Sequence, residues 1–169
     1  MTISFVIFET SWGWVGLAGN NIGVACLTLP APSPLITYES LLTEMGPSIS
    51  ENAALFPEVR QQIISYFRGD RIIQWNAPVV VEGYSSFQQA VLKETALIPY
   101  GCTLTYGEVA NRIGRPKTAR AIGQTLGRNR IAIMIPCHRV VGKDSLGGFS
   151  APGGLVTKKA LLKLEGITV

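Results

Sequence analysis

The sequence predicts an α/β fold in two parts, a small α/β region in the first half and a mainly helical region in the second. Short segments rich in β-branched and aromatic residues fill positions 2–29, and such segments are typical of strands. Capping and periodic patterns typical of helices dominate after residue 85. The 169 residues are 47% hydrophobic and 15% charged, which suffices for one domain or two small domains with a buried core.

The first half begins with predicted strands. ISFVIFET (3–10) and GWVGLAG (13–19) are followed by a GNN turn signal and then by IGVACLTL (22–29). Three prolines between residues 30 and 34 end this run. Cys26, in the third segment, is interpreted as a buried strand cysteine that behaves as a small apolar side chain.

A helix is predicted in ENAALFPEVRQQIISYFRGD (51–70), which Gly69 ends. Its apolar side chains fall on one face: Val59, Ile63, Ile64 and Phe67. The apolar piece PVVVEGY then leads into the second half, where both the pattern and the charge change. We therefore predict a domain boundary near residue 84, with domains over 1–84 and 85–169.

Charge is divided unevenly along the chain. Residues 1–84 hold three basic and seven acidic side chains, a net charge of −4, whereas residues 85–169 hold twelve and four, a net charge of +8. Seven basic residues and no acidic residue occur from Arg112 to Arg139. A solvated surface is the ordinary interpretation of such a stretch, but positive charge persists through the whole second half and favours a polyanion partner.

Helices are predicted in succession through the second half. SSFQQAVLKETALIP has a serine start, helical spacing of apolar residues and a proline stop. Thr105 and Glu108 in TYGEVANRIG have capping-box spacing, so a helix should start at Tyr106 and end at Gly114. After a turn of about three residues, TARAIGQTLGRN gives a second short helix, and the pair forms a helix-turn-helix pattern. The alternative is an ordinary helical hairpin in a core.

Three small residues of the second helix argue against that alternative, because they allow the backbone to approach another surface closely: Ala119, Ala121 and Gly123. IAIMI (131–135) is predicted to be a buried strand that delivers Cys137. A glycine-rich loop, GKDSLGGFSAPGG, and a last helix, LVTKKALLKLEG, follow.

The motif IPCHRVVG places Cys137 directly before His138, the one histidine of the chain. A free thiol has a pKa of about 8.5, so it needs a base in order to react near neutral pH, and an imidazole can take its proton. Glu165 is the candidate carboxylate for the other imidazole nitrogen. Adjacent side chains of an extended strand point to opposite faces, so the spacing alone does not bring these groups together.

No metal site or cofactor is predicted. The three cysteines cannot all pair, they form no CxxC motif, and one histidine cannot complete a Cys/His ligand set. Cys102 is interpreted as a structural thiol. The N-terminus lacks a basic segment, and no apolar run approaches the ~18 residues of a membrane span. We expect a soluble, cytoplasmic protein without a membrane partner.

Four motifs in order over residues 85–166 resemble the methylated-DNA–protein-cysteine methyltransferases, also called O6-alkylguanine-DNA alkyltransferases: YGEVA, TARAIGQTLGRN, IPCHRVVG and GGFSAPGG. The resemblance is faint over 1–84. It implies a small ribonuclease-H-like α/β domain there, and a DNA-binding, alkyl-accepting domain with a helix-turn-helix over 85–169. It also implies irreversible, stoichiometric transfer from O6-alkylguanine in DNA, with O4-alkylthymine as a second candidate substrate, after the damaged base flips out of the duplex.

The resemblance implies roles for five residues around the thiol. Cys137 would accept the alkyl group, His138 would draw off the thiol proton through a water, and Glu165 would orient His138. Tyr106 would sit beside the flipped base and donate its phenolic proton to the leaving guanine. Asn129 would tie the recognition helix to the strand that carries Cys137.

Further residues are expected at the DNA and at the base pocket. Arg120 would enter the base stack from a helix that lies in the minor groove. Its expected companions at the DNA are Thr118, Ala119, Ala121, Gly123 and Arg128. The expected pocket residues are Pro136, Val140, Phe149 and Ser150. Phe149 stands where the family often has tyrosine, so any hydroxyl contact there is lost. Double-stranded DNA with alkylated guanine is the expected partner, and the protein is expected to be a monomer.

Three other functions fit parts of the sequence. A non-catalytic, alkyltransferase-like lesion-binding protein usually carries tryptophan in place of Cys137. A helix-turn-helix regulator gives no reason for Cys137, His138 and Glu165 together. A cysteine hydrolase leaves Arg120 unexplained, and burst-then-steady hydrolysis of a reporter ester would favour it.

Overall fold

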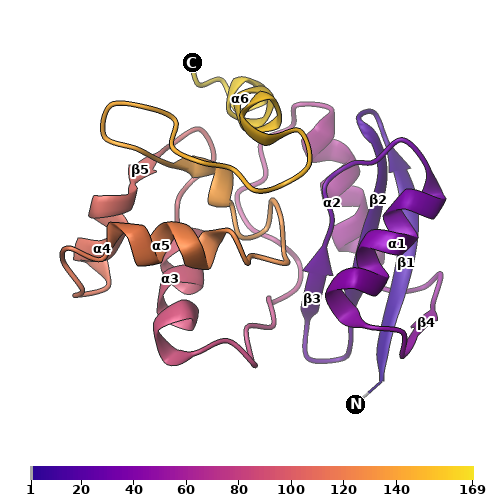
Figure 1. Cartoon of the computed structure of the whole chain (residues 1–169). Coiled ribbons are helices and arrows are strands. Elements are labelled where there is room, and N and C mark those ends of the chain that lie inside the picture. The colour runs from indigo at the N-terminus through magenta and orange to yellow at the C-terminus, as the bar shows by residue number, and fades with distance from the viewer. Residues whose placement is uncertain (1) are drawn as a thin grey trace. The chain divides into compact units, whose positions relative to one another are not determined.

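The computed structural model describes residues 2–169, which form an α/β fold with a mixed sheet and a set of helices (Figure 1). The described residues group into two compact units. The first runs to Val80 and also includes Arg130–Met134, and the second comprises Val81–Asn129 and Ile135–Val169. Among the described residues, no helix is both long enough and apolar enough to cross a membrane.

The first unit contains a four-stranded sheet of order β3-β2-β1-β4. Its strands are β1 (Ile3–Thr10), β2 (Gly13–Gly19), β3 (Val24–Leu27) and β4 (Ile49–Glu51). The first three are antiparallel neighbours and β4 runs parallel to β1. The three strands predicted from segments rich in β-branched and aromatic residues are confirmed, and Cys26 is buried within β3 as expected. The short β4 was not predicted.

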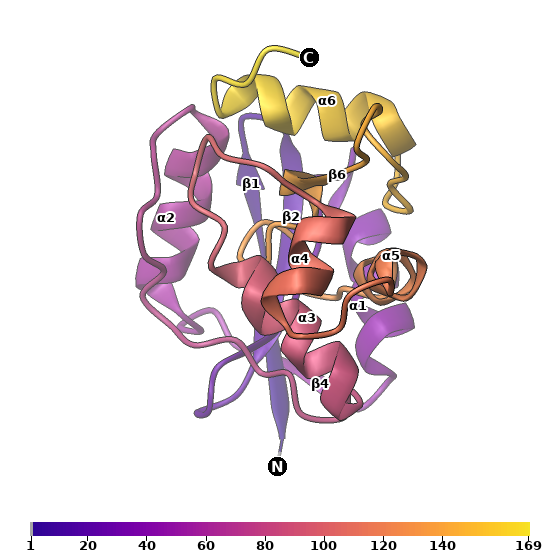
Figure 2. The same ribbon diagram turned by 90° about the vertical axis from the view of Figure 1, so that its left-hand side faces the viewer.

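Two helices, α1 (Pro34–Met45) and α2 (Pro57–Phe67), lie on opposite sides of this sheet (Figure 2). The sequence analysis missed α1, although Ser33 caps it through the Ile36 N–H at 3.3 Å and Pro34 occupies its first turn. The predicted helix over 51–70 is correct only from Pro57, because Phe56 adopts a left-handed φ of 44° that ends the preceding segment.

The predicted strand over 131–135 is wrong, although most of its side chains are buried. Ile131 forms an isolated bridge to Leu27 of β3, outside any strand. The Met134 N–H then donates to the Ala132 carbonyl at 2.7 Å around Ile133, whose φ is 67°. A three-residue turn of this hand is strained for a β-branched residue. Two backbone hydrogen bonds hold the segment in place: the Ala132 N–H donates to the Leu27 carbonyl, and the Leu27 N–H donates to the Arg130 carbonyl.

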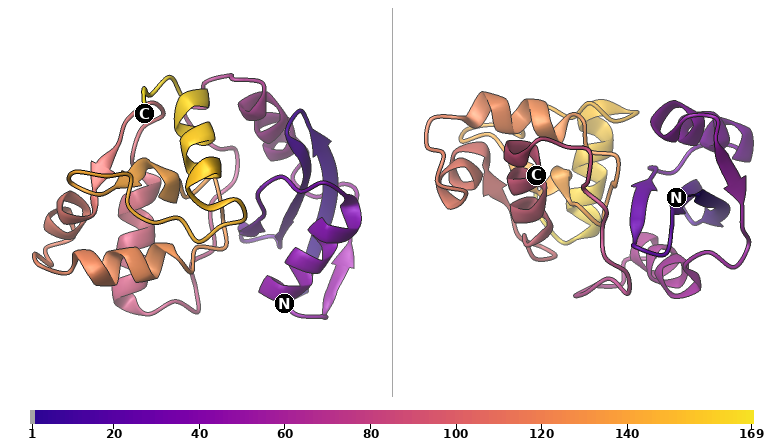
Figure 3. Two further views of the ribbon diagram at one scale, coloured as in Figure 1. Left: turned by 45° about the horizontal axis from the view of Figure 1, so that its top comes forward. Right: turned by 90° about the horizontal axis from the view of Figure 1, so that it is seen from below.

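The second unit carries four helices and one pair of very short parallel strands (Figures 1 and 3). The helices are α3 (Ser86–Ala96), α4 (Tyr106–Arg112), α5 (Ala119–Leu126) and α6 (Gly154–Leu164). The strands are β5 (Leu104–Thr105) and β6 (Val140–Val141). The predicted capping box of Thr105 and Glu108 is confirmed, and α4 starts at Tyr106 but ends before Gly114.

Candidate active site

Cys137 lies in a tight turn and not at the end of an extended strand. Residues Cys137–Arg139 form a single 3₁₀ turn, and Pro136 precedes it with φ −80° and ψ 67°. The Cys137 N–H donates to the Ile135 carbonyl at 2.8 Å across that proline, which is the geometry of an inverse γ-turn. The fixed φ of proline suits this turn. Neighbouring side chains in a 3₁₀ turn diverge by about 120°, so the opposite-face restriction of a strand does not apply.

His138 and Glu165 meet in the interior, 27 residues apart in the chain. The His138 Nε2 atom lies 2.7 Å from Glu165 Oε1, and both side chains are fully buried. Glu165 is the capping residue directly after α6, and the Glu165 N–H donates to the Leu161 carbonyl at 3.1 Å. The structure therefore brings together the histidine and the carboxylate that the sequence analysis singled out.

Arg139 completes this cluster, and the sequence analysis missed it. Arg139 donates from Nε to Glu165 Oε2 at 2.8 Å and from Nη2 to Oε1 at 2.9 Å, a two-bond fork. Its side chain is 8% exposed, so it does not belong to the basic surface in which the sequence analysis counted it. A buried carboxylate needs a partner cation, and Arg139, two residues after the thiol, is that cation.

The charge state of this cluster follows from its burial and its partners. Burial would raise the pKa of Glu165, but hydrogen bonds from His138 and Arg139 and their charges lower it to about 2. Burial lowers the pKa of His138. The charges of Arg139 and Lys158 lower it further, whereas the hydrogen bond and the charge of Glu165 raise it. At neutral pH the pair is therefore a carboxylate and a neutral imidazole. Its Nε2–H then donates to Glu165, which leaves Nδ1 as the basic nitrogen.

The Cys137 thiol is half-buried next to donors and a cation. Burial raises its pKa, while the Asn129 side chain, the Lys158 charge and the backbone N–H groups of Cys137 and His138 act in the opposite direction. Asn129 also donates from Nδ2 to the Ile135 carbonyl at 2.9 Å. It thus links the end of α5 to the turn that carries the thiol, as expected, although that turn is not a strand.

Lys158 is a second group that the sequence analysis missed. Its side chain is fully buried, and Nζ donates to the carbonyls of Val140 at 2.6 Å and Gly148 at 3.1 Å. Burial lowers its pKa to about 8, against the opposing effect of the Cys137 thiolate. Helical spacing could have found it, because Lys158 shares one face of α6 with Leu161, Leu162 and Glu165.

Tyr106 and the loop after β6 form one side of the site. The Tyr106 hydroxyl points to the Gly148 carbonyl at 3.4 Å, and Lys158 Nζ lies 5.8 Å from the centre of its ring. Burial raises the pKa of Tyr106, and the Cys137 thiolate adds to this against the Gly148 bond. Gly147 has φ 72°, and a Cβ there would lie 2.6 Å from the Tyr106 hydroxyl. The loop and the ring therefore lie in close contact.

The other predicted pocket residues lie on the same loop and turn. Pro136 is buried before the thiol, and Phe149 is half-buried. The Val140 carbonyl accepts from Lys158 and retains one lone pair. The Ser150 hydroxyl donates to the Gly127 carbonyl at 3.2 Å, which fastens the loop to the end of α5. The loop lies between α5 and α6 (Figure 3).

Of the six residues predicted to contact DNA, three are exposed, two on α5 and one just after it. Ala119, Arg120 and Arg128 are exposed, and Gly123 lies beside the Tyr106 ring, where a Cβ would be 3.6 Å from it. Ala121 is half-buried and lies about half a turn away from Ala119, so these two alanines lie on different faces of α5. Thr118 is half-buried, and its hydroxyl donates to the Arg115 carbonyl at 2.6 Å.

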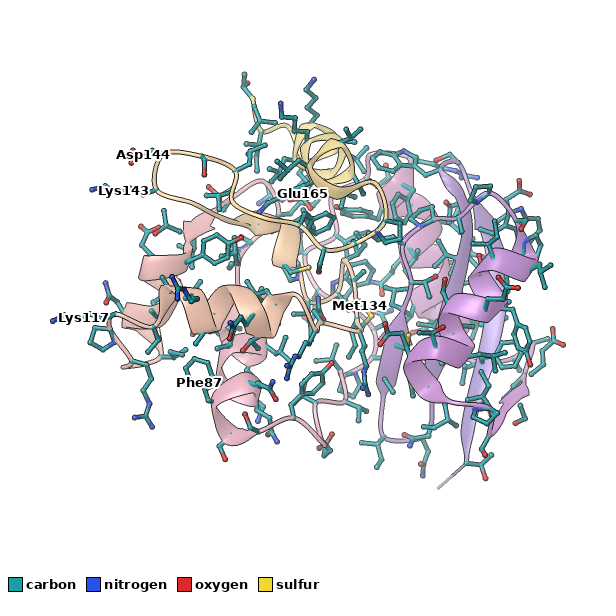
Figure 4. All side chains as sticks on the ribbon, viewed as in Figure 1. Phe87, Lys117, Met134, Lys143, Asp144 and Glu165 are labelled. Carbon is teal, nitrogen blue, oxygen red and sulfur yellow. The ribbon has the colours of Figure 1, made fainter. Side chains whose placement is uncertain are left out.

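Further basic side chains lie around this surface. Lys117, in the turn between α4 and α5, and Lys143, in the loop after β6, point outward from the second unit (Figure 4). Two other basic residues of the predicted stretch are engaged in exposed ion pairs, Arg112 with Glu94 at 3.5 Å and Arg130 with Glu44 at 3.2 Å. Exposed pairs of this kind are weak.

The two remaining cysteines differ from Cys137. Burial, with the Glu44 charge adding to it and Arg130 opposing it, raises the pKa of Cys26 to about 12. Cys102, expected as a structural thiol, is exposed in the turn before β5. Among residues 2–169, no group of three His, Cys, Asp or Glu side chains could hold a metal ion.

Comparison with known proteins identifies a matching family and several similar proteins. Residues 86–167 match the family described as 6-O-methylguanine DNA methyltransferase, DNA binding domain. The chain is 39% identical over 163 residues to a methylated-DNA–protein-cysteine methyltransferase of Methanosarcina acetivorans, covering 96% of this chain and 97% of that one.

Two solved structures have a similar fold. One is the Mycobacterium tuberculosis O6-methylguanine methyltransferase, with TM-score 0.77, 33% identity and coverage of 97% of this chain and 93% of the other. The second is Mycobacterium tuberculosis OGT in complex with DNA, with TM-score 0.77, 33% identity and coverage of 96% and 92%.

Proposed function

The chain belongs to the methylated-DNA–protein-cysteine methyltransferase family, and on that premise we propose that it repairs DNA by taking the alkyl group of O6-alkylguanine onto its own Cys137. The observation that supports this most is the buried cluster of His138, Arg139 and Glu165, whose first two members directly follow the half-buried thiol in the chain. Burying ionisable groups is costly, and a helix-turn-helix regulator gives no reason for them. A lesion-binding protein usually carries tryptophan in place of Cys137.

The proposed reaction is an in-line displacement. The Cys137 thiol passes its proton through a bound water to Nδ1 of His138, and the thiolate attacks the alkyl carbon. The S–C bond forms as the bond from that carbon to O6 breaks, and Tyr106 donates its phenolic proton to the leaving guanine. The proton gained by His138 balances the one lost by Tyr106, and the products are a thioether and guanine. A thioether is a poor leaving group, so each molecule reacts once.

Lys158 supports the proposed chemistry in two ways. Its charge lowers the pKa of the Cys137 thiol, which increases the thiolate fraction available for attack. Its bonds to the Val140 and Gly148 carbonyls fix the two chain segments that flank the proposed base pocket. Pro136, Phe149 and Ser150 line the remainder of that pocket in this proposal.

The exposed face of α5 is the proposed DNA surface. A solved relative is in complex with DNA, which supports DNA as the partner, and the exposed Ala119, Arg120 and Arg128 favour this face. In the proposal α5 lies in the minor groove, and Arg120 occupies the place of the flipped nucleotide. The helix-turn-helix description of α4 and α5, the ribonuclease-H-like first domain, the boundary at residue 84 and the monomeric state stay predictions.

Counting repair events per protein molecule tests this function. The protein is mixed with a tenfold excess of a duplex that contains one O6-methylguanine, and restored guanine is measured over time. We expect repair to stop at one guanine per protein molecule, and a Cys102→Ser control to give the same end point. Repair that continues past this ratio contradicts a stoichiometric acceptor, and absence of repair contradicts the function itself.

A further inference from the structure

The turn between α3 and β5 contacts the buried cluster at three points. The Ile98 carbonyl accepts from Arg139 Nη1 at 2.6 Å, and the Arg139 guanidinium lies 5.7 Å from the centre of the Tyr100 ring. The Gly101 N–H points to Glu165 Oε2 at 3.3 Å. Tyr100 is itself fixed, because its hydroxyl donates to the Leu164 carbonyl at 3.1 Å. The turn therefore holds both members of the Arg139–Glu165 pair.

We propose that Arg139, held by the turn Ile98–Gly101, is a positioning residue that fixes the Glu165 carboxylate, so that the proton leaving Cys137 stays on His138. This inference rests on the proposed function, since it concerns the proton path of that reaction. It extends the Cys-His-Glu arrangement by a fourth residue and a chain segment that touch neither the base nor the thiol.

The hydrogen bonds at Glu165 support this role. Its Oε1 atom meets His138 Nε2 and Arg139 Nη2, and its Oε2 atom meets Arg139 Nε and the Gly101 N–H. A proton arriving on the carboxylate would have to displace one of these four donors. Glu165 is therefore a poor final acceptor, and it holds the imidazole in one tautomer with Nδ1 as the base.

The chemistry of the side chain explains why arginine occupies this place. Its planar fork can meet both carboxylate oxygens and still donate to a carbonyl on the other side, and it stays charged at any working pH. A lysine offers one point charge and cannot make the fork. The ring of Tyr100 also favours a planar cation over its face.

The balance of charge around His138 sets the direction of the expected effect. The charged groups that act on its pKa are Glu165, Arg139 and Lys158. Cys137 precedes it in the chain, Tyr106 lies beyond Lys158, and Tyr100 lies beyond Arg139. Arg139 and Lys158 lower the proton affinity of the imidazole, and Glu165 raises it. Removing Arg139 while Glu165 stays ionised must therefore move protonation of His138 to higher pH.

The single histidine allows a direct test by NMR. Nitrogen and carbon shifts of the His138 ring give its tautomer and its protonation midpoint in wild type, Arg139→Lys and Arg139→Met. We expect the Nε2–H tautomer in wild type. We expect the midpoint to rise by about one pH unit, tenfold in proton affinity, in Arg139→Met, and by less in Arg139→Lys. Arg112→Met removes an exposed, paired arginine and should leave the midpoint unchanged.

A second readout measures the thiol without DNA. The rate of iodoacetamide labelling of Cys137, mapped by peptide mass, should rise with pH at a higher midpoint in Arg139→Met than in wild type. A merely structural role would lower the amount of folded protein but not move either midpoint. If Arg139→Met does not fold, Arg139→Lys and the wild-type tautomer decide the question.

Two results would overturn the inference: an Nδ1–H tautomer in the wild type, or unchanged midpoints in a folded variant of Arg139. Failure of the proposed function looks different. In that case the NMR and labelling results hold, but duplex containing O6-methylguanine leaves Cys137 unmodified.

Discussion

The surroundings of Cys26 and Cys137 show what separates an inert thiol from a nucleophile. Cys26 lies in β3 among Phe5, Ala18 and Leu41, and burial raises its pKa to about 12. Burial also raises the pKa of Cys137, but there the Asn129 side chain, two backbone N–H groups and the Lys158 charge work against it. Burial alone protects a thiol. Hydrogen-bond donors and a cation beside a buried thiol lower its pKa and so favour the thiolate.

The largest expected effect comes from replacing Cys137 and Cys26 with serine in two separate variants. Cys137→Ser should abolish methyl transfer while DNA binding is retained, because basic contacts supply most of the affinity. Cys26→Ser should transfer at the wild-type rate. Single-turnover repair and a DNA-binding titration measure both. Methyl uptake by Cys137→Ser at the wild-type rate, on Cys26 or Cys102, would remove the distinction between the two sites.

Acid should loosen the surroundings of Cys137 before those of Cys26. The pKa of Glu165 is lowered in the folded state from 4.5 to about 2, so its stabilising contribution is present above pH 4.5 and is lost as the pH falls toward 2. The full loss is of the order of 3 kcal/mol.

Urea unfolding of wild type and Glu165→Gln between pH 6 and pH 3 measures this contribution. The free energy of unfolding of the wild type should fall more steeply with acid than that of the variant. Parallel curves would show that Glu165 has an ordinary pKa and that the cluster is not organised by charge.

Presentation of the substrate is a separate requirement from thiol chemistry, and Arg120 tests it. Arg120→Ala should slow repair of duplex DNA by roughly thirtyfold, about 2 kcal/mol, because the flipped state loses the side chain that fills the stack. The loss should be smaller on single-stranded or mispaired DNA, where flipping is already cheap.

The same three substrates distinguish a wedge from a phosphate contact. A phosphate contact would weaken all of them alike and reduce the salt dependence by about one ion. Equal losses on all three, with full recovery in Arg120→Lys, would assign Arg120 to the DNA backbone. Iodoacetamide labelling of Cys137 should be unchanged in Arg120→Ala, because the thiol environment is intact.

Replacing Lys158 should give the smallest effect, because the substitution makes the surroundings of Cys137 more like those of Cys26. In Lys158→Met the pKa of Cys137 rises, since the opposing charge is gone. Labelling at neutral pH should therefore fall by about tenfold, one pKa unit, and recover at higher pH. A stopped-flow pH profile measures this. An unchanged profile would mean that Lys158 acts only by holding the Val140 and Gly148 carbonyls.

Local patterns allowed much of the fold to be predicted. The capping box of Thr105 and Glu108 involves neighbours in sequence, and it appears in the structure as expected. The strands β1 and β2 were predicted from their β-branched and aromatic residues and are present in the structure. The helix α1 was missed because the prolines before it were interpreted only as the end of the strands, although proline also suits a first helical turn.

The remaining features depend on contacts that no local pattern contains. The apolar run at 131–135 fits a strand or a buried turn equally well, and Leu27 of β3 decides between them. His138 and Glu165 were expected to meet, but the roles of Arg139 and Lys158 depend on the Ile98 and Val140 carbonyls, which only tertiary structure supplies. Residue type alone suggests that Arg139 and Lys158 are exposed surface charges.

The mass of the protein after reaction tests the central claim most directly. The full chain is incubated with duplex DNA containing O6-methylguanine, and its intact mass and peptide masses are compared with those of an unreacted sample. The account predicts a gain of one methyl group, confined to the peptide that contains Cys137, with Cys26 and Cys102 unmodified. An unchanged mass alongside repaired DNA, or a methyl group on another residue, would contradict it.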